Sequence, residues 1–223
     1  MTRVVTYSPL RRRVPPAVDR GLRFVRHPGA YKSARRIRGK QVICDCVNAG
    51  ALFVHVPKTA GRSVADGVFG RPLPHYPIDL YRLVFSPKEI DRLFVFAFVR
   101  DPVDRTRSAF QYLPSSPAAH DRRWADAHLR PYKSLDAFVL HHLADPDVQR
   151  QLHFRPQANW ICAGRTGMPA VDFVGRFERL QDDYKVICDE LGITAELPAI
   201  NRSPPTEASL ALSDRAVERI YDV

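Results

Sequence analysis

The segment from Leu52 to Ser63 contains residue types that bind anions. Its apolar first half, which ends at Val56, is typical of a buried strand. Small residues follow, and the first amides of the next helix can point at phosphate or sulfate oxygens while Lys58 adds a point charge. We expect Gly61 to give this loop its flexibility. The candidate binding residues are therefore Lys58, Thr59, Ala60, Gly61, Arg62 and Ser63.

The order of lysine and glycine in this loop argues against a nucleotide-triphosphate site. In the loop G-x-x-x-x-G-K-[ST] the lysine follows the glycines, whereas Lys58 precedes Gly61 by three residues. A small-molecule kinase built on a phosphate loop of that type is disfavoured, but it stays an alternative.

A second strand-to-helix segment, from Phe94 to Phe110, has its own phosphate-binding pattern. The apolar run ends in Arg100, and Asp101 and Pro102 are typical of the N-cap and first turn of a helix. Ser108 follows Arg100 by eight residues, so its hydroxyl and the guanidinium could converge on one phosphate.

Both segments resemble motifs of the sulfotransferases. The first resembles their 5′-phosphosulfate loop, in the branch with His-x-Pro-Lys-Thr-[Ala/Gly]-Gly-x-Ser that includes many bacterial enzymes and the heparan sulfate 2-O-sulfotransferases. The second resembles their 3′-phosphate element. The resemblance implies that Arg100 and Ser108 hold the 3′-phosphate of 3′-phosphoadenosine 5′-phosphosulfate, the sulfuryl donor, and that 3′-phosphoadenosine 5′-phosphate is the product. It further implies an α/β fold, a P-loop-like parallel sheet flanked by helices.

A histidine between the two motifs is the candidate catalytic base. In the relatives this connection carries a histidine proposed to take the proton of the acceptor hydroxyl, and His75 matches it. Glu89 and Asp91 rank below it, because they lie in what reads as a helix start, where acids are expected anyway. Lys58 is expected to stabilise charge on the leaving phosphate. No metal is required.

Other parts of the resemblance are less specific. The segment Leu197–Pro205 resembles a loop that lies near the donor nucleotide in relatives. The resemblance implies that Asn201, Arg202 and Ser203 contact the nucleotide. Position 62 is usually threonine or serine in the family, so Arg62 either adds a donor contact or points to solvent. Residues 114–131 are expected to form a loop or short helices over the acceptor site. The acceptor is a hydroxyl, with a glycan or glycolipid favoured over a phenol or another small alcohol.

The length and the charge distribution suggest one domain with a basic extension. A chain of 223 residues suffices for one α/β domain, expected over residues 41–223, after a poorly ordered arm over residues 1–40. Of the 34 Lys and Arg residues, 12 lie in that arm against one acid, Asp19, so the net charge of +10 does not indicate a nucleic-acid-binding face. The arm reads as a solubilising extension, with contact to an anionic acceptor or membrane surface, or organelle targeting, as alternatives.

The remaining composition gives expectations about compartment and cysteine chemistry. No apolar run approaches a membrane span, and residues 1–16 lack the apolar core of a secretory signal, so a cytoplasmic protein is expected. The four cysteines lack metal-site spacing and are expected to be reduced thiols. A noncatalytic nucleotide- or polyanion-binding protein of the same fold stays the second alternative, and the sequence leaves the oligomeric state open.

Overall fold

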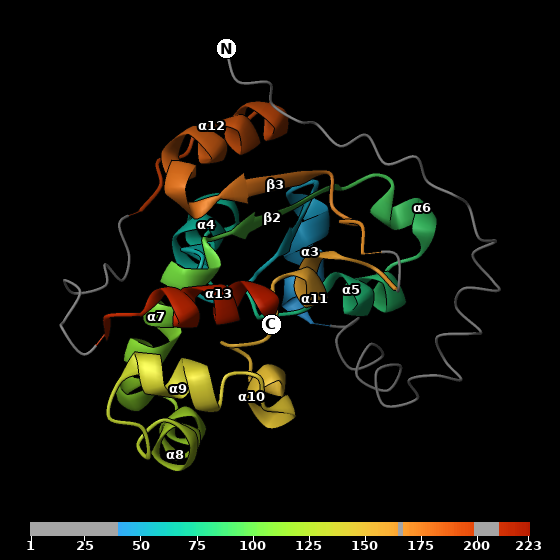
Figure 1. Ribbon diagram of the computed structural model, residues 1–223. Coiled ribbons are helices and arrows are strands. Elements are labelled where there is room, and N and C mark those ends of the chain that lie inside the picture. Colours follow the sequence, from blue (N-terminus) through green and yellow to red (C-terminus); the bar gives the residue numbers. More distant parts are fainter. Residues whose placement is uncertain (1–39, 165–166, 199–209) are drawn as a thin grey trace. The chain divides into compact units, whose positions relative to one another are not determined.

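The computed structural model describes residues 40–164, 167–198 and 210–223, and these form two compact units (Figure 1). The sheet unit contains the described residues within Met1–Val56, Ala60–Val99 and Gln157–Pro198. The helical unit contains those within Pro57–Thr59, Arg100–Pro156 and Ala199–Val223. The predicted boundary between an arm and a domain at residue 40 stays a prediction, because residues 1–39 lie outside the described part.

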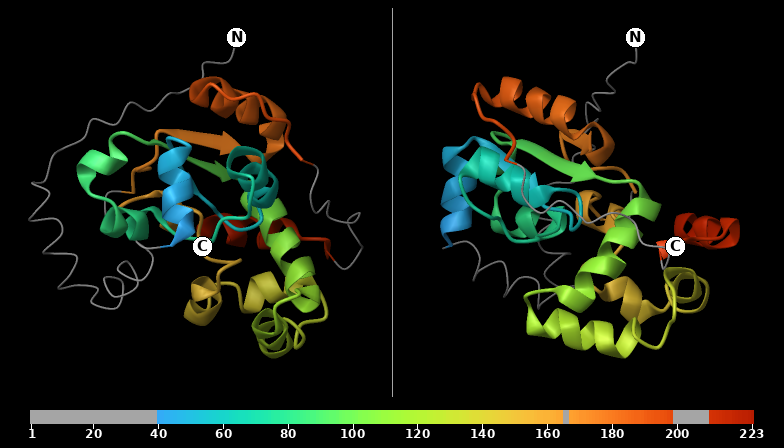
Figure 2. Two further views of the ribbon diagram at one scale, coloured as in Figure 1. Left: turned by 180° about the vertical axis from the view of Figure 1, so that it is seen from behind. Right: turned by 90° about the vertical axis from the view of Figure 1, so that its left-hand side faces the viewer.

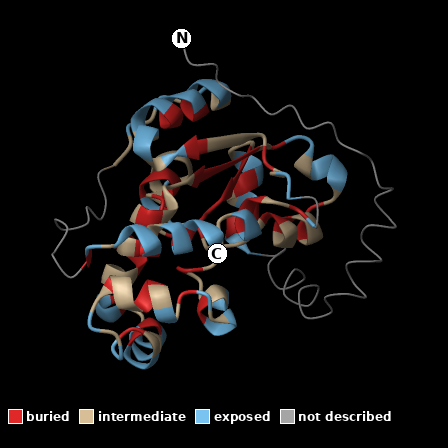
Figure 3. Ribbon diagram, in the orientation of Figure 1, coloured by how far each residue is buried: buried red, intermediate tan, exposed pale blue. Residues whose placement is uncertain are grey.

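The sheet unit is built on three parallel strands in the order β1-β2-β3. They are β1 (Ala51–Val54), β2 (Phe94–Val99) and β3 (Phe173–Arg176), and Figure 2 shows them from two further sides. The register pairs Leu52 with Val95 and Ala97 with Val174. All four residues of β1 and the central four of β2 are buried (Figure 3), as expected for parallel strands with helices around them. The prediction of a parallel sheet in an α/β fold is confirmed.

Helices that precede or follow the strands in the chain pack around this sheet. Helix α3 (Gln41–Asn48) packs against β1, and α12 (Leu180–Leu191), which follows the 3₁₀ turn η2 (Phe177–Arg179), packs against β3. Helix α4 (Gly61–Phe69) begins after the loop that follows β1. Helix α5 (Ile78–Val84) packs against the short α11 (Ala158–Ile161), and α6 (Pro87–Ile90) is a single turn before β2.

The helical unit has its own apolar core. It comprises α7 (Pro102–Tyr112), the 3₁₀ turn η1 (Leu113–Ser115), α8 (Ala119–His128), α9 (Leu135–His141), α10 (Pro146–Arg150) and α13 (Asp214–Asp222). Helix α13 packs against α7 and α9, and Ser213 donates its hydroxyl and its amide N–H to the carboxylate of Asp136. The core includes Leu113, Phe138 and Ile220. Residues 114–131, expected to form a loop or short helices, contain the ten-residue α8.

The predicted start of α7 is confirmed in detail. The Asp101 carboxylate accepts hydrogen bonds from the amides of Val103 and Asp104 at 2.9 and 3.0 Å, and Pro102 occupies the first turn. The second carboxylate oxygen accepts a hydrogen bond from the Tyr221 hydroxyl at 2.8 Å. Asp101 therefore fixes both the start of α7 and the position of α13 within the helical unit.

Candidate functional site

The loop after β1 has an unusual backbone. Lys58 and Ala60 have φ angles of 70° and 59°, in the left-handed region that residues other than glycine rarely adopt. Such conformations cost about 1–3 kcal/mol each and occur preferentially at functional sites. Ala60 is the N-cap of α4 and offers no side-chain cap. The backbone is therefore shaped by its surroundings at the point where the sequence predicts anion binding.

Gly61 has a different role from the one expected. Its φ angle lies outside the left-handed region, so the loop does not use the conformational freedom of glycine at this position. The left-handed conformations occur at Lys58 and Ala60 instead. A Cβ atom on Gly61 would lie 2.1 Å from Cδ2 of His55, closer than real Cβ contacts. The expectation was wrong in its reason: the loop needs glycine here because the imidazole of His55 occupies the space of the missing side chain.

Lys58 and Arg100 lie together in the helical unit, although 42 residues separate them. Nη1 of Arg100 donates to the Lys58 carbonyl oxygen at 3.4 Å. Nζ of Lys58 lies 3.9 Å above the centre of the Tyr112 ring, a cation–π contact. Burial, and secondarily the charge of Arg100, lowers the pKa of Lys58 from 10.5 to about 8. The two sequence motifs thus meet at the Lys58 backbone, and the charge of Arg100 acts on the Lys58 ammonium.

Arg105 is a loop-positioning residue that the sequence analysis missed. Its side chain is buried, and burial lowers its pKa to about 10. Nε donates to the Pro57 carbonyl at 3.1 Å, and Nη2 donates to the Arg155 carbonyl at 2.8 Å. The sequence around position 105 carries no signal of this role, because both partners of the guanidinium lie 48 and 50 residues away in the chain.

The other predicted loop residues differ in exposure. Thr59 and Ser63 are buried, as is Ser108 on α7. The Arg62 side chain is 54% exposed and pairs with Asp66 at 3.4 Å, which favours the alternative in which it points to solvent. Asn201, Arg202 and Ser203 lie outside the described residues.

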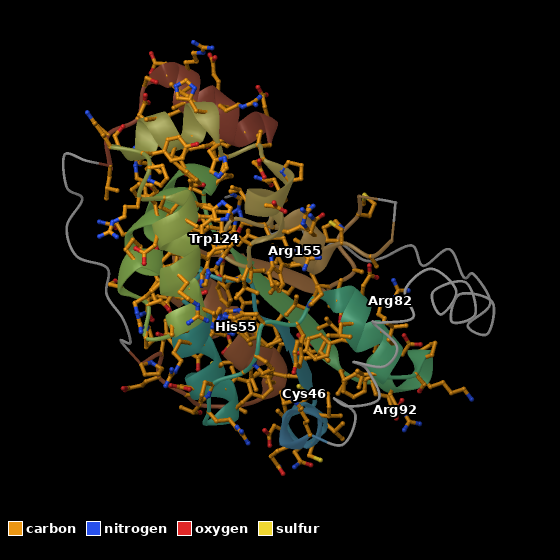
Figure 4. The ribbon with its side chains drawn as sticks, turned by 90° about the horizontal axis from the view of Figure 1, so that it is seen from below. Cys46, His55, Arg82, Arg92, Trp124 and Arg155 are labelled. Carbon is orange, nitrogen blue, oxygen red and sulfur yellow. The ribbon has the colours of Figure 1, made fainter. Side chains whose placement is uncertain are left out.

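Two histidines face each other in the sheet unit. His55, which follows β1 (Figure 4), is buried, and its Nδ1 donates to the Leu73 carbonyl at 2.9 Å. Nδ1 of His75 donates to the His55 carbonyl at 2.9 Å, and the two ring centroids are 3.9 Å apart. The ring of His75 also meets the edge of Trp160 at 6.3 Å. Because a carbonyl can only accept, a neutral His75 has its lone pair on Nε2, the atom that can take a proton.

The competing carboxylate Glu89 already has a structural use. It belongs to a capping box at α6, in which its carboxylate accepts from the Ser86 amide and the Ser86 hydroxyl accepts from the Glu89 amide. Asp91 is the C-cap of the same helix. These contacts agree with ranking both acids below His75 as a base.

A comparison with protein-family models matches residues 79–218, well over half of the chain, to a model described as the sulfotransferase family. The chain belongs to the sulfotransferase family. The matched residues include Arg100 and Ser108, whereas the loop of Lys58 and the histidine pair precede them. No curated protein and no solved structure matched the chain in the same comparisons. The α/β fold and a sulfuryl transferase activity in general are therefore supported by family membership.

The helical unit of this sulfotransferase-family chain also contains an open pocket of about 490 Å³. Trp124 of α8 (Figure 4) stacks on His128 at 4.5 Å beside it. The Asp121 carboxylate accepts a hydrogen bond from the Ser116 hydroxyl at 2.8 Å, and the Tyr112 hydroxyl lies 3.2 Å from the Ser116 hydroxyl. Because the Ser116 hydroxyl has a single hydrogen and donates it to Asp121, the Tyr112 hydroxyl is the donor in its hydrogen bond with Ser116. The pocket is lined by His120, Asp121, Trp124, His128, Asp147, Arg150, Gln151 and Leu152.

Residues 40–164, 167–198 and 210–223 hold no group of three or more His, Cys, Asp or Glu side chains arranged to bind a metal ion. Within the same ranges, the structure has no helix of the length and apolar character needed to cross a membrane. The four cysteines are unbridged, and burial, with Asp45 adding to it, raises the pKa of Cys46 to about 12.

Proposed function

We propose that this chain transfers the sulfuryl group of 3′-phosphoadenosine 5′-phosphosulfate to an acceptor hydroxyl. The observation that carries the proposal is the hydrogen bond from Arg100 to the Lys58 carbonyl, which joins two separate motifs. One motif would serve the 5′-phosphosulfate end of the anionic donor and the other its 3′-phosphate end. Family membership supports the same activity class.

Each motif has a part in holding the donor. The amides of residues 58–63 and the hydroxyls of Thr59 and Ser63 bind the 5′-phosphosulfate, with Lys58 as the cation and the start of α4 as the positive helix end. Arg100 and Ser108 bind the 3′-phosphate, and Asn201, Arg202 and Ser203 contact the nucleotide. Arg105 holds the Pro57 carbonyl and so fixes the backbone from which Lys58 projects.

The transfer itself is an in-line displacement at sulfur. Nε2 of His75 takes the acceptor hydroxyl proton while the acceptor oxygen forms a bond to sulfur. The bond from sulfur to the 5′-phosphate oxygen breaks, and its electron pair leaves with the phosphate. Lys58 stabilises the charge that develops there, as positioned cations do in phosphoryl transfer.

A glycan or glycolipid is the acceptor class that we favour. The pocket beside Trp124 is lined partly by residues of 114–131, the segment expected to lie over the acceptor site, and partly by residues of 147–152. It combines an indole face with carboxylate, imidazole, guanidinium and amide groups. Its Asp121 connects through Ser116 to Tyr112, whose ring holds Lys58. Contact of the basic arm with an anionic acceptor or surface belongs to the same proposal.

Transfer of labelled sulfate tests this function. The purified chain is incubated with sulfur-labelled donor and a panel of oligosaccharides, glycolipids and phenols, and labelled product is counted. We expect transfer by the wild type and by His141→Ala, a control at an exposed histidine of α9, and loss in His75→Ala. Donor binding by the wild type without transfer to any acceptor class would favour the noncatalytic alternative, and phosphoryl transfer from ATP would favour the kinase.

A further inference from the structure

His55 and the segment that carries His75 hold each other through two reciprocal hydrogen bonds. The side chain of His55 donates to the backbone of Leu73, and the side chain of His75 donates to the backbone of His55, each at 2.9 Å. The partners are 18 and 20 residues apart in the chain. Both acceptors are carbonyl oxygens, so both Nδ1 atoms carry a proton. This pair of bonds therefore fixes the tautomer of both neutral rings.

The same imidazole also sets the position of α4. A Cβ atom on Gly61 would meet Cδ2 and Nε2 of His55 at 2.1 and 2.3 Å, so the ring lies directly against the first residue of the helix. His55 consequently contacts the end of β1, residues 73–75 and the start of α4.

His55 is unsuited to be the base itself. It is 6% exposed, and its pKa is lowered to about 3 by burial first and then by His75 and Arg62, against an opposing effect of the Leu73 carbonyl. The ring is therefore neutral at physiological pH and adds no positive charge beside His75. The charged or titratable groups acting on it are His75 and Arg62.

We propose that His55 is a positioning residue of the sulfuryl transfer, which holds residues 73–75 against the start of α4 so that His75 presents Nε2 to the acceptor. This inference rests on the proposed function, since it takes His75 as the base. Two properties of the side chain are required: an N–H donor at the δ position for the Leu73 carbonyl, and a flat ring that leaves room for Gly61 alone. The imidazole at position 55 therefore requires glycine at position 61.

Nitrogen-15 spectra of histidine-labelled full-length protein test the first requirement without any substrate. His55→Asn retains an N–H close to the position of Nδ1, whereas His55→Leu fills a similar volume but donates nothing. We expect His75 to show a single tautomer protonated on Nδ1 in the wild type and in His55→Asn, and a mixture of tautomers in His55→Leu. An unchanged His75 tautomer in His55→Leu, or its loss in both variants, would overturn the proposal.

Thermal unfolding tests the second requirement. Gly61→Ala should lower the melting temperature by several degrees in the wild type, because the new methyl group meets the ring, and should cause no further fall in a His55→Ala background. Equal falls in both backgrounds would contradict the pairing. Titration with 3′-phosphoadenosine 5′-phosphate separates this inference from the proposed function: a wild type that fails to bind it contradicts the donor site, while the tautomer and the coupling report on His55 alone.

Discussion

Replacement of Lys58 by methionine should stabilise the protein while it abolishes donor binding. The pKa of Lys58 is lowered from 10.5 to about 8, so the charged form is disfavoured in the folded state. The unfolded chain binds more protons between these two values, so this group makes stability rise with pH from about 8 to 10.5 and costs stability below that window. The pKa difference corresponds to about 3 kcal/mol at neutral pH.

The lost contact with Tyr112 offsets part of this gain. A cation–π contact of this kind contributes about 1 kcal/mol, so Lys58→Met should raise the free energy of unfolding by about 2 kcal/mol. Methionine is unbranched and apolar, and it can fill the space of the lysine stem without a charge. For a chain of this size the melting temperature should rise by roughly 5 °C.

Chemical denaturation at neutral pH, with a parallel nucleotide titration, measures both effects. Lys185→Met is the matched control, because Lys185 is 74% exposed and pairs with Asp189 on the surface. It should change stability by less than about 0.5 kcal/mol and leave nucleotide affinity unaltered. A Lys58→Met variant that is less stable than the wild type, or that still binds 3′-phosphoadenosine 5′-phosphate normally, would refute the reasoning about this buried cation.

Three further results are expected. Because donor binding should restore the charge of Lys58, calorimetry at about pH 8 in buffers of different ionisation enthalpy should show uptake of about half a proton, and constant enthalpy across buffers would count against it. Gly67→Ala should destabilise the sheet unit by about 1–3 kcal/mol, since a Cβ there lies 2.2 Å from the Tyr184 hydroxyl, and Tyr184→Phe should relieve most of this loss; an equal loss in both backgrounds would disprove the clash. Asp101→Ala should cost about 1 kcal/mol in denaturation experiments through its lost cap, whereas Asp101→Asn keeps the acceptor and should stay within a few tenths; equal losses would deny the cap.

Local features of this chain could be predicted from sequence because neighbouring residues determine them. Asp101 and Pro102 mark the start of α7 through contacts within four residues, and the apolar runs of β1 and β2 indicate a buried parallel sheet. The parts that escaped prediction depend on residues far apart in the chain. The role of Gly61 is visible only once the His55 ring lies against it, and that of Arg105 only once the Pro57 carbonyl, 48 residues away, is in reach.

The candidate site follows the same division. Residue types and spacing indicated Lys58 and Arg100 as anion-binding candidates, because anion binding restricts which side chains can serve. His75 was predicted from the resemblance to the sulfotransferases, and the chemistry of proton transfer supports it. Tyr112, whose ring contacts Lys58, carries no comparable signal, since an aromatic residue in a helix is an ordinary core residue. His55 matches the first residue of the loop motif, but its contacts with the Leu73 carbonyl and Gly61 are visible only in the structure. Positioning is a property of the folded chain and needed the structure.

Recognition of the donor's 3′-phosphate by Arg100 is the core of the proposed function, and calorimetry can test it directly. The wild type and Arg100→Ala are each titrated with 3′-phosphoadenosine 5′-phosphate, adenosine 5′-phosphate and ATP. We predict micromolar or tighter binding of the bisphosphate by the wild type, weak binding of the other two, and a loss of about 10- to 100-fold in Arg100→Ala that affects the bisphosphate alone. Equal affinity of the wild type for the bisphosphate and the monophosphate, or no binding of either, would contradict the donor site.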